Sequence, residues 1–140
     1  MVNSTLDSNG LSLGINPREA LFDVQPGTEL NIRNTLIKDV NSVKWGGAIY
    51  NEGTLKAENM SFYNNSSTLS GAIANMSHAT LNGNMKFTSN RSSNDGGAIF
   101  NIGTLDISSG GGHSIDFSSN SAGKFGGAIY NGKGSITHSD

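Results

Sequence analysis

The chain has 140 residues, a formal net charge of −2, 19 glycines and no cysteine, and 34% of its residues are hydrophobic. This length suits one domain with a modest core, the charge lacks the basic excess of a nucleic-acid surface, and without cysteine there are neither disulfides nor thiolate metal sites. No stretch reaches the roughly 18 apolar residues of a membrane-spanning helix, and residues 1–13 lack the charged and apolar regions of a signal peptide.

Residues 1–19 are predicted to form an N-terminal leader that partly caps the repeats behind it. Apolar residues alternate with small polar ones over 11–15, which is the period of a strand. The Asn-Pro pair at 16–17 predicts a turn after this strand. For residues 1–10, a disordered leader is an equally good prediction.

Residues 20–140 are organised as a repeat, which has to be considered before any single residue because it decides the fold. One phrase reads Gly-Gly-Ala-Ile, an aromatic residue and Asn at 46–51, 96–101 and 126–131, and it reads Ser-Gly-Ala-Ile-Ala-Asn at 70–75. A second phrase, between the copies, places Asn three residues after Phe. The predicted coils cover 20–45, 46–69, 70–95, 96–125 and an incomplete 126–140.

The first copy of the repeat is degenerate. Aligning its Ala-Leu-Phe-Asp at 20–23 with Ala-Ile-Tyr-Asn at 48–51 puts Leu21 at the position of Ile49. Ile37 and Val40 then stand at the Phe and Asn positions of the second phrase. The first coil is therefore predicted to replace an aromatic ring and an amide with two aliphatic side chains.

Each repeat contains three short apolar runs separated by turns, for example at 48–50, 55–57 and 60–62. The last two runs alternate apolar and polar residues, which is the spacing of a strand and not of a helix. Asn and Gly, which tolerate positive φ, mark the turns. Three strands and three turns in roughly 25 residues predict one coil of a parallel β-helix. The predicted fold is all-β, a single-stranded parallel β-helix of about five coils.

Stacked coils bring equivalent residues together in ladders at the strand spacing of about 4.8 Å. The predicted inward ladders are an aromatic one of Phe62, Phe87 and Phe117, an aliphatic one of Ile49, Ile73, Ile99 and Ile129, and another of Leu55, Leu81, Leu105 and Ile136. Side-chain amides can bond both to one another and to turn backbone. Two such ladders are predicted at corners: Asn65, Asn90 and Asn120, and Asn51, Asn75, Asn101 and Asn131. The pattern leaves open whether Ala48 or Ile49 points inward.

The alternation of Gly-Gly-Ala-Ile with Phe-x-x-Asn over residues 46–131 resembles the repeats of the chlamydial polymorphic membrane proteins. Similar repeats occur in passenger domains of other bacterial autotransporters and in adhesin-like surface proteins of some archaea. The resemblance implies a right-handed β-helix that acts as an adhesin at the cell surface or outer membrane, or after secretion. It also implies a protein or glycan receptor on another cell as the partner.

The sequence offers no evident catalytic, cofactor or metal site. Asp106 and Asp116 are the carboxylates that one repeat could bring together, but both are predicted to face outward. His78 and His113 are predicted in longer turns and His138 near the chain end, without the spacing of a metal-binding pair. An enzyme is therefore not expected, and a polysaccharide-degrading β-helix is the least favoured function.

Trp45 and Phe125 precede their glycine pairs, where the other copies have Leu69 and Asp95. Both aromatic residues are candidate contacts for a partner, although packing on a corner turn explains them as well. The leading function is an adhesin-type segment that attaches to a host or neighbouring cell. The alternative is a structural stalk or a self-associating filament unit, because the strand edges at the two ends of a solenoid invite pairing.

Overall fold

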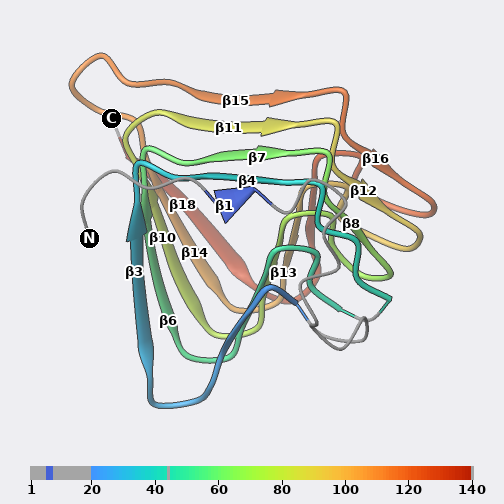
Figure 1. Ribbon diagram of the computed structural model, residues 1–140. Coiled ribbons are helices and arrows are strands. Elements are labelled where there is room, and N and C mark those ends of the chain that lie inside the picture. Colours follow the sequence, from blue (N-terminus) through green and yellow to red (C-terminus); the bar gives the residue numbers. More distant parts are fainter. Residues whose placement is uncertain (1–5, 8–19, 44, 140) are drawn as a thin grey trace.

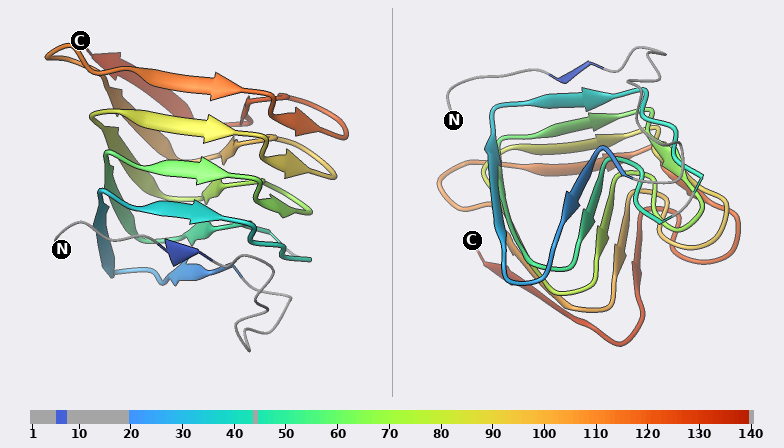
Figure 2. Two further views of the ribbon diagram at one scale, coloured as in Figure 1. Left: turned by 45° about the horizontal axis from the view of Figure 1, so that its top comes forward. Right: turned by 60° about the horizontal axis from the view of Figure 1, so that its bottom comes forward.

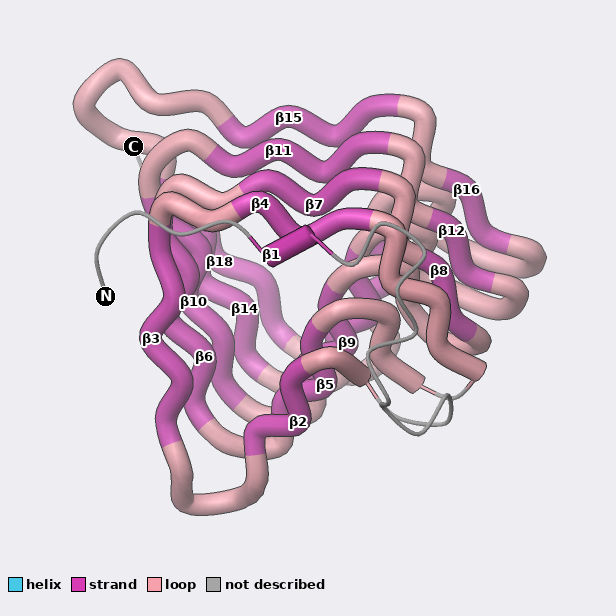
Figure 3. The backbone as a smooth tube through the Cα atoms, in the orientation of Figure 1, coloured by secondary structure: helices cyan, strands magenta, loops and turns pink. Residues whose placement is uncertain are grey.

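The computed structural model describes residues 6–7, 20–43 and 45–139, and every regular element in these ranges is a β-strand (Figure 3). The strands form four sheets that the chain visits in the same order in successive coils (Figure 1). All strand pairs are parallel and join equivalent residues of neighbouring coils. The predicted all-β parallel β-helix is therefore confirmed.

The first sheet holds β2 (Phe22–Val24), β5 (Ile49–Asn51), β9 (Ile73–Asn75), β13 (Ile99–Asn101) and β17 (Ile129–Asn131). The second sheet holds β3 (Glu29–Arg33), β6 (Thr54–Glu58), β10 (His78–Asn82), β14 (Thr104–Ser108) and β18 (Ser135–Ser139). The third sheet holds β4 (Leu36–Lys38), β7 (Ser61–Tyr63), β11 (Met85–Thr88) and β15 (Ile115–Ser118), with β1 (Leu6–Asp7) beside β4. The fourth sheet holds β8 (Ser66–Ser67), β12 (Arg91–Ser92) and β16 (Ser121–Ala122).

The solenoid is right-handed, because the chain runs clockwise away from the viewer when it is followed from the N-terminal coil at the front of Figure 1. Figure 2 shows the coils stacked along one axis, with the strands of the fourth sheet projecting together on one side. The structure has about four turns and not the predicted five. The last stretch supplies only β17 and β18, so the described chain passes through the third sheet four times after β1.

Of the predicted leader, the structure describes residues 6–7. This strand, β1, pairs in parallel with β4 and places Leu6 opposite Ile37 and Asp7 opposite Lys38. The strand predicted over 11–15 and the turn predicted at 16–17 lie outside the described residues.

The register of the first coil corrects one alignment and agrees with another. Phe22, and not Leu21, lies opposite Ile49 in the first sheet. The degenerate copy lacks the glycine pair that anchors the alignment of the later copies, so its sequence could be shifted by one residue. In the third sheet, Ile37 lies opposite Phe62, as the alignment of the second phrase predicts.

The second sheet corrects the predicted leucine ladder. Ala79 lies opposite both Leu55 and Leu105, and Leu81 stands two residues further along β10. The sequence alignment matched Leu81 with the other leucines. In the structure the asparagines of the first sheet are in register, and β10 begins at His78, three residues after Asn75. His78 therefore lies in a strand and not in the predicted turn.

The Gly-Gly-Ala-Ile phrase forms a bend at the entrance to the strands β5, β9, β13 and β17 of the first sheet. The N–H groups of Ala48 and Ile49 both donate to the carbonyl oxygen of Ala72, at 3.0 and 2.9 Å, and the same pattern recurs in the next two coils. The bond from Ile49 belongs to the parallel ladder, whereas the bond from Ala48 comes from the bend before the strand. Because Ala48 precedes the strand, it does not follow the strand's alternation, and Ala48 and Ile49 are both buried in the core.

The second glycine of each pair lets neighbouring coils approach closely. A Cβ atom added to Gly71 would lie 2.0 Å from the carbonyl oxygen of Gly97, and a Cβ added to Gly47 would lie 1.7 Å from that of Gly71. Real Cβ atoms do not come this close to backbone atoms, so an alanine would push the coils apart. At Gly127 the nearest atom is the carbonyl oxygen of Asn120, at 3.6 Å, which is an ordinary contact.

Gly71→Ala is therefore expected to lower the free energy of unfolding by about 1–3 kcal/mol, the usual cost of overpacking. Gly127→Ala is the matched control, since the same substitution at the equivalent position makes only an ordinary van der Waals contact. Urea denaturation followed by circular dichroism measures both. Equal stability of the two variants would contradict the close approach of the coils at Gly71.

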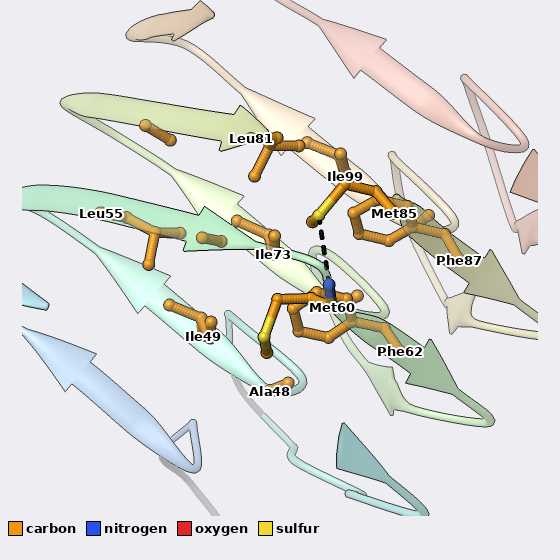
Figure 4. Close-up of a cluster of buried hydrophobic side chains, with 14 of the residues drawn as sticks. Ala48, Ile49, Leu55, Met60, Phe62, Ile73, Leu81, Met85, Phe87 and Ile99 are labelled. Carbon is orange, nitrogen blue, oxygen red and sulfur yellow. Dashed lines mark hydrogen bonds between the residues drawn. The ribbon is translucent and has the colours of Figure 1, made fainter. Parts of the chain in front are cut away.

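The interior is filled by aligned apolar side chains (Figure 4). The ring of Phe87 stacks on those of Phe62 and Phe117, with centroid distances of 5.0 and 4.8 Å and 6° between the planes of each pair. Beside this stack, the N–H of Met60 points at the sulfur of Met85, 3.4 Å away (Figure 4). In the aliphatic ladder of the first sheet, Ile49, Ile73 and Ile99 are fully buried, and Ile129 in the last coil is partly exposed.

Two columns of asparagine amides run along the solenoid. In the first sheet the Nδ2 atom of each residue donates to the Oδ1 of the next, at 2.8, 2.7 and 2.8 Å, through Asn51, Asn75, Asn101 and Asn131. At the corner after the third sheet the corresponding distances are 3.0 and 3.1 Å, through Asn65, Asn90 and Asn120. The backbone is left-handed one residue before this second column, at Asn64, Ser89 and Ser119. No buried side-chain nitrogen or oxygen in the described residues lacks a hydrogen-bond partner.

Candidate functional site

The outer face of the first sheet carries a column of aromatic side chains. Tyr50, Ala74, Phe100 and Tyr130 are in register on β5, β9, β13 and β17. Each follows an inward isoleucine, and neighbouring residues of a strand point to opposite faces. Because each strand begins at the isoleucine, directly after the bend, the aromatic residue of the repeated phrase faces outward.

These rings contact one another and a tryptophan in the loop before them. Phe100 and Tyr130 stack with centroids 5.2 Å apart and 20° between their planes. Trp45 lies against Tyr50 with centroids 5.9 Å apart at an interplanar angle of 46°. Ala74 is fully buried although it faces outward, so neighbouring side chains cover it.

Trp45 and Phe125 are the most exposed aromatic residues beside this column. The side chain of Trp45 is 53% exposed and that of Phe125 is 65% exposed. They occupy equivalent positions, directly before the glycine pairs of the second and last coils. We call the surface formed by Trp45, Tyr50, Phe100, Phe125 and Tyr130 the aromatic stripe.

The surroundings of Tyr50 keep its hydroxyl group protonated. Partial burial raises the pKa of the Tyr50 hydroxyl above its usual value, and the negative charges of Glu52 and Asp23 raise it further. The group is therefore an uncharged hydrogen-bond donor at neutral pH. This suits a surface that makes apolar and polar contacts at once.

The sequence predicted Trp45 and Phe125 as outward residues but not Tyr50, Phe100 and Tyr130. The direction of these three rings depends on where the bend ends and the strand begins, and the order of residues alone left this open. The usable signal was the aromatic residue that follows isoleucine in three of the four copies, at 50, 100 and 130. Phe100 in this column is 9% exposed, but none of the three rings belongs to the core cluster that contains the inward Phe62 and Phe87.

The outer face of the second sheet is polar, and it carries two pairs of oppositely charged or titratable side chains. Lys56 lies 3.4 Å from Glu29, which also accepts a hydrogen bond from Asn31 at 2.8 Å. Hydrogen bonds from Asn31 and Lys56 hold the pKa of the Glu29 carboxyl below its usual value. Further along, Nε2 of His78 lies 3.4 Å from the carboxylate of Asp106.

The candidate catalytic carboxylates are not brought together. Asp106 lies on β14 in the second sheet, where it pairs with His78, whereas Asp116 lies on β15 in the third sheet. Within residues 6–7, 20–43 and 45–139, no group of three His, Cys, Asp or Glu side chains could hold a metal ion. The same residues include no helix long and apolar enough to cross a membrane.

Comparison with known proteins gives one match. The Chlamydia polymorphic membrane protein repeat matches twice, at residues 84–102 and 114–132. No curated protein and no solved structure matches the chain. Each matched segment begins at the phenylalanine strand of the third sheet and ends just after the asparagine of the first sheet. The two segments that match the Chlamydia polymorphic membrane protein repeat thus lie in successive coils of a right-handed parallel β-solenoid.

Proposed function

We propose that this chain is part of a non-enzymatic surface protein whose solenoid attaches its cell to a host or neighbouring cell. The repeat, which occurs in membrane proteins of Chlamydia, supports a location at the cell surface or outer membrane, or outside the cell. The observation that carries the adhesive role is the aromatic stripe. Receptor binding, and not catalysis, is the function that such a surface fits.

Within the aromatic stripe, Trp45 and Phe125 expose large rings, Tyr50 and Tyr130 are half-buried, and Phe100 is buried. Exposed apolar side chains on soluble proteins can mark interaction sites when they gather on one face, and tryptophan and tyrosine are enriched among the residues that contribute most to binding. The coils hold these rings at fixed spacing on a sheet with a well-packed interior. Little conformational entropy is therefore lost when a partner docks on the stripe.

The adhesive role predicts that beads coated with the full chain adhere to cultured cells and that the double variant Trp45→Ala, Phe125→Ala reduces adhesion about tenfold or more, as for residues at the centre of an interface. Tyr63→Ala is the control, because Tyr63 is also an exposed ring, at 47%, but lies on the third sheet. Circular dichroism checks that the variants remain folded.

Loss of adhesion in Tyr63→Ala to the same extent would contradict a specific role for the stripe. Absence of adhesion both by this chain and by a longer native protein containing it would contradict the adhesive function. The alternative of a stalk or filament unit predicts a mass that rises with concentration in light scattering. A strictly monomeric chain would contradict that alternative.

A further inference from the structure

A cleft of about 350 Å³ lies over the fourth sheet. Its floor is formed where β8 and β12 run side by side, with Ser66 opposite Arg91, and where Asn41 bridges to Ser66. Thr68 and Ser93 form part of its wall. This volume is at the lower end of the range for small-molecule sites, about 300–1,000 Å³.

Arg91 is a cation without a partner in this cleft. Its side chain is exposed, and it forms no ion pair or side-chain hydrogen bond with any residue that the structure describes. By contrast, Lys56 in the cleft over the second sheet is paired with Glu29. The guanidinium group of Arg91 therefore has its N–H donors available, in the planar arrangement that matches a carboxylate or a sulfate.

The hydroxyl groups around Arg91 present acceptors. The Oγ of Ser66 donates to Asn41 Oδ1 at 3.1 Å, and the Oγ1 of Thr68 donates to the carbonyl oxygen of Val43 at 2.6 Å. The Oγ of Ser93 donates to the carbonyl oxygen of Thr68 at 3.4 Å. A hydroxyl has one hydrogen and two lone pairs, so each of these oxygens keeps acceptor capacity toward the cleft.

We propose that this cleft binds an acidic carbohydrate, an inference that rests on the proposed attachment to another cell's surface and names its chemistry. A carboxylate or sulfate group of the sugar pairs with Arg91, and sugar hydroxyls donate to Ser66, Thr68 and Ser93. Val43, which is 57% exposed, lines the same cleft and offers apolar surface to the C–H groups of the sugar ring.

The cleft favours a sugar over an acidic peptide. A sugar acid combines one anionic group with several hydroxyl donors, which matches one guanidinium surrounded by acceptor oxygens. An extended peptide also brings carbonyl acceptors, for which the cleft walls have few free hydrogens. Val43 is two residues before Trp45, so a longer glycan bound here would continue onto the aromatic stripe.

The test measures binding of the full chain to immobilised heparin, hyaluronate, a sialylated polymer and neutral dextran. Wild-type protein is expected to bind at least one acidic polymer and not dextran, and Arg91→Gln is expected to weaken this binding about tenfold or more. Lys86→Gln removes the same charge from the exposed outer face of the third sheet and should leave binding unchanged. Ser93→Ala, which keeps the charge, is expected to weaken binding to a smaller extent.

The sulfated and carboxylated polymers distinguish the two anionic groups. Equal loss in Arg91→Gln and Lys86→Gln would reveal nonspecific attraction to positive charge and overturn the proposal, as would the absence of binding to every acidic polymer. Treating the cells with protease or with glycan-degrading enzymes before the adhesion assay distinguishes a protein receptor from a carbohydrate receptor. Adhesion that is abolished by protease and unaffected by removal of acidic glycans would overturn the cleft's assignment while the proposed attachment through the stripe remained.

Discussion

Phe87→Ala is expected to lower the free energy of unfolding by about 3–5 kcal/mol, the range for truncation of a buried phenylalanine. Phe87 is the middle ring of the internal stack and is fully buried. Its removal leaves a cavity between two rings that the coils above and below hold in place, so the site cannot collapse easily. Chemical denaturation gives the difference in stability directly.

Thr104→Ala serves as the comparison, because Thr104 faces outward on β14 and is only half-buried. Its replacement should cost about 1 kcal/mol or less, the span of strand propensity. A similar loss of stability at the two sites would refute the inward aromatic ladder.

Asn90→Ala is expected to be destabilising to a comparable degree, by about 3–5 kcal/mol, because it leaves several buried polar groups unpaired at once. The Oδ1 of Asn90 accepts hydrogen bonds from the backbone and side-chain nitrogens of Asn65, at 3.1 and 3.0 Å. Its Nδ2 donates to the carbonyl oxygen of Phe62 at 3.0 Å and to Asn120 at 3.1 Å. An alanine offers none of these partners.

The control for this substitution is Asn94→Ala, four residues along the same coil. The side-chain amide of Asn94 makes no hydrogen bond with the described residues, and its removal should change stability by about 0.5 kcal/mol or less. If Asn90→Ala were as mild as Asn94→Ala, the amide column would not be a source of stability. Thermal unfolding of the two variants side by side makes this comparison.

The sequence was sufficient to predict the fold because two short phrases recur along the chain and keep their internal spacing. Phe and Asn separated by three positions keep the third sheet and the following corner in register, and the structure pairs Phe62 with Phe87 and Phe87 with Phe117. The predicted register was wrong where the sequence allowed two nearly equivalent alignments. In β10 the apolar residues Ala79 and Leu81 are two positions apart, so matching by leucine shifts the strand without changing which residues face inward.

The aromatic stripe could not be predicted completely because it depends on backbone geometry. Alternation in a regular strand would place Ala48 and Tyr50 on one face and Ile49 on the other. Ala48 lies in the bend before the strand and does not follow this alternation, so Ala48 and Ile49 are both buried and Tyr50 remains on the outer face. The cleft at Arg91 was also missed, since Ser and Thr residues are so common in this chain that no sequence pattern singles them out.

The amide columns have a further consequence, which concerns electrical polarity. In both columns every hydrogen bond between two amides runs from the Nδ2 of one coil to the Oδ1 of the next coil toward the C-terminus. The side-chain dipoles therefore add along the axis, and hydrogen bonds in such a chain strengthen one another. A solenoid of this kind has two electrically different ends, and an aspartate at any rung would interrupt the column, because a carboxylate accepts hydrogen bonds but has none to pass on.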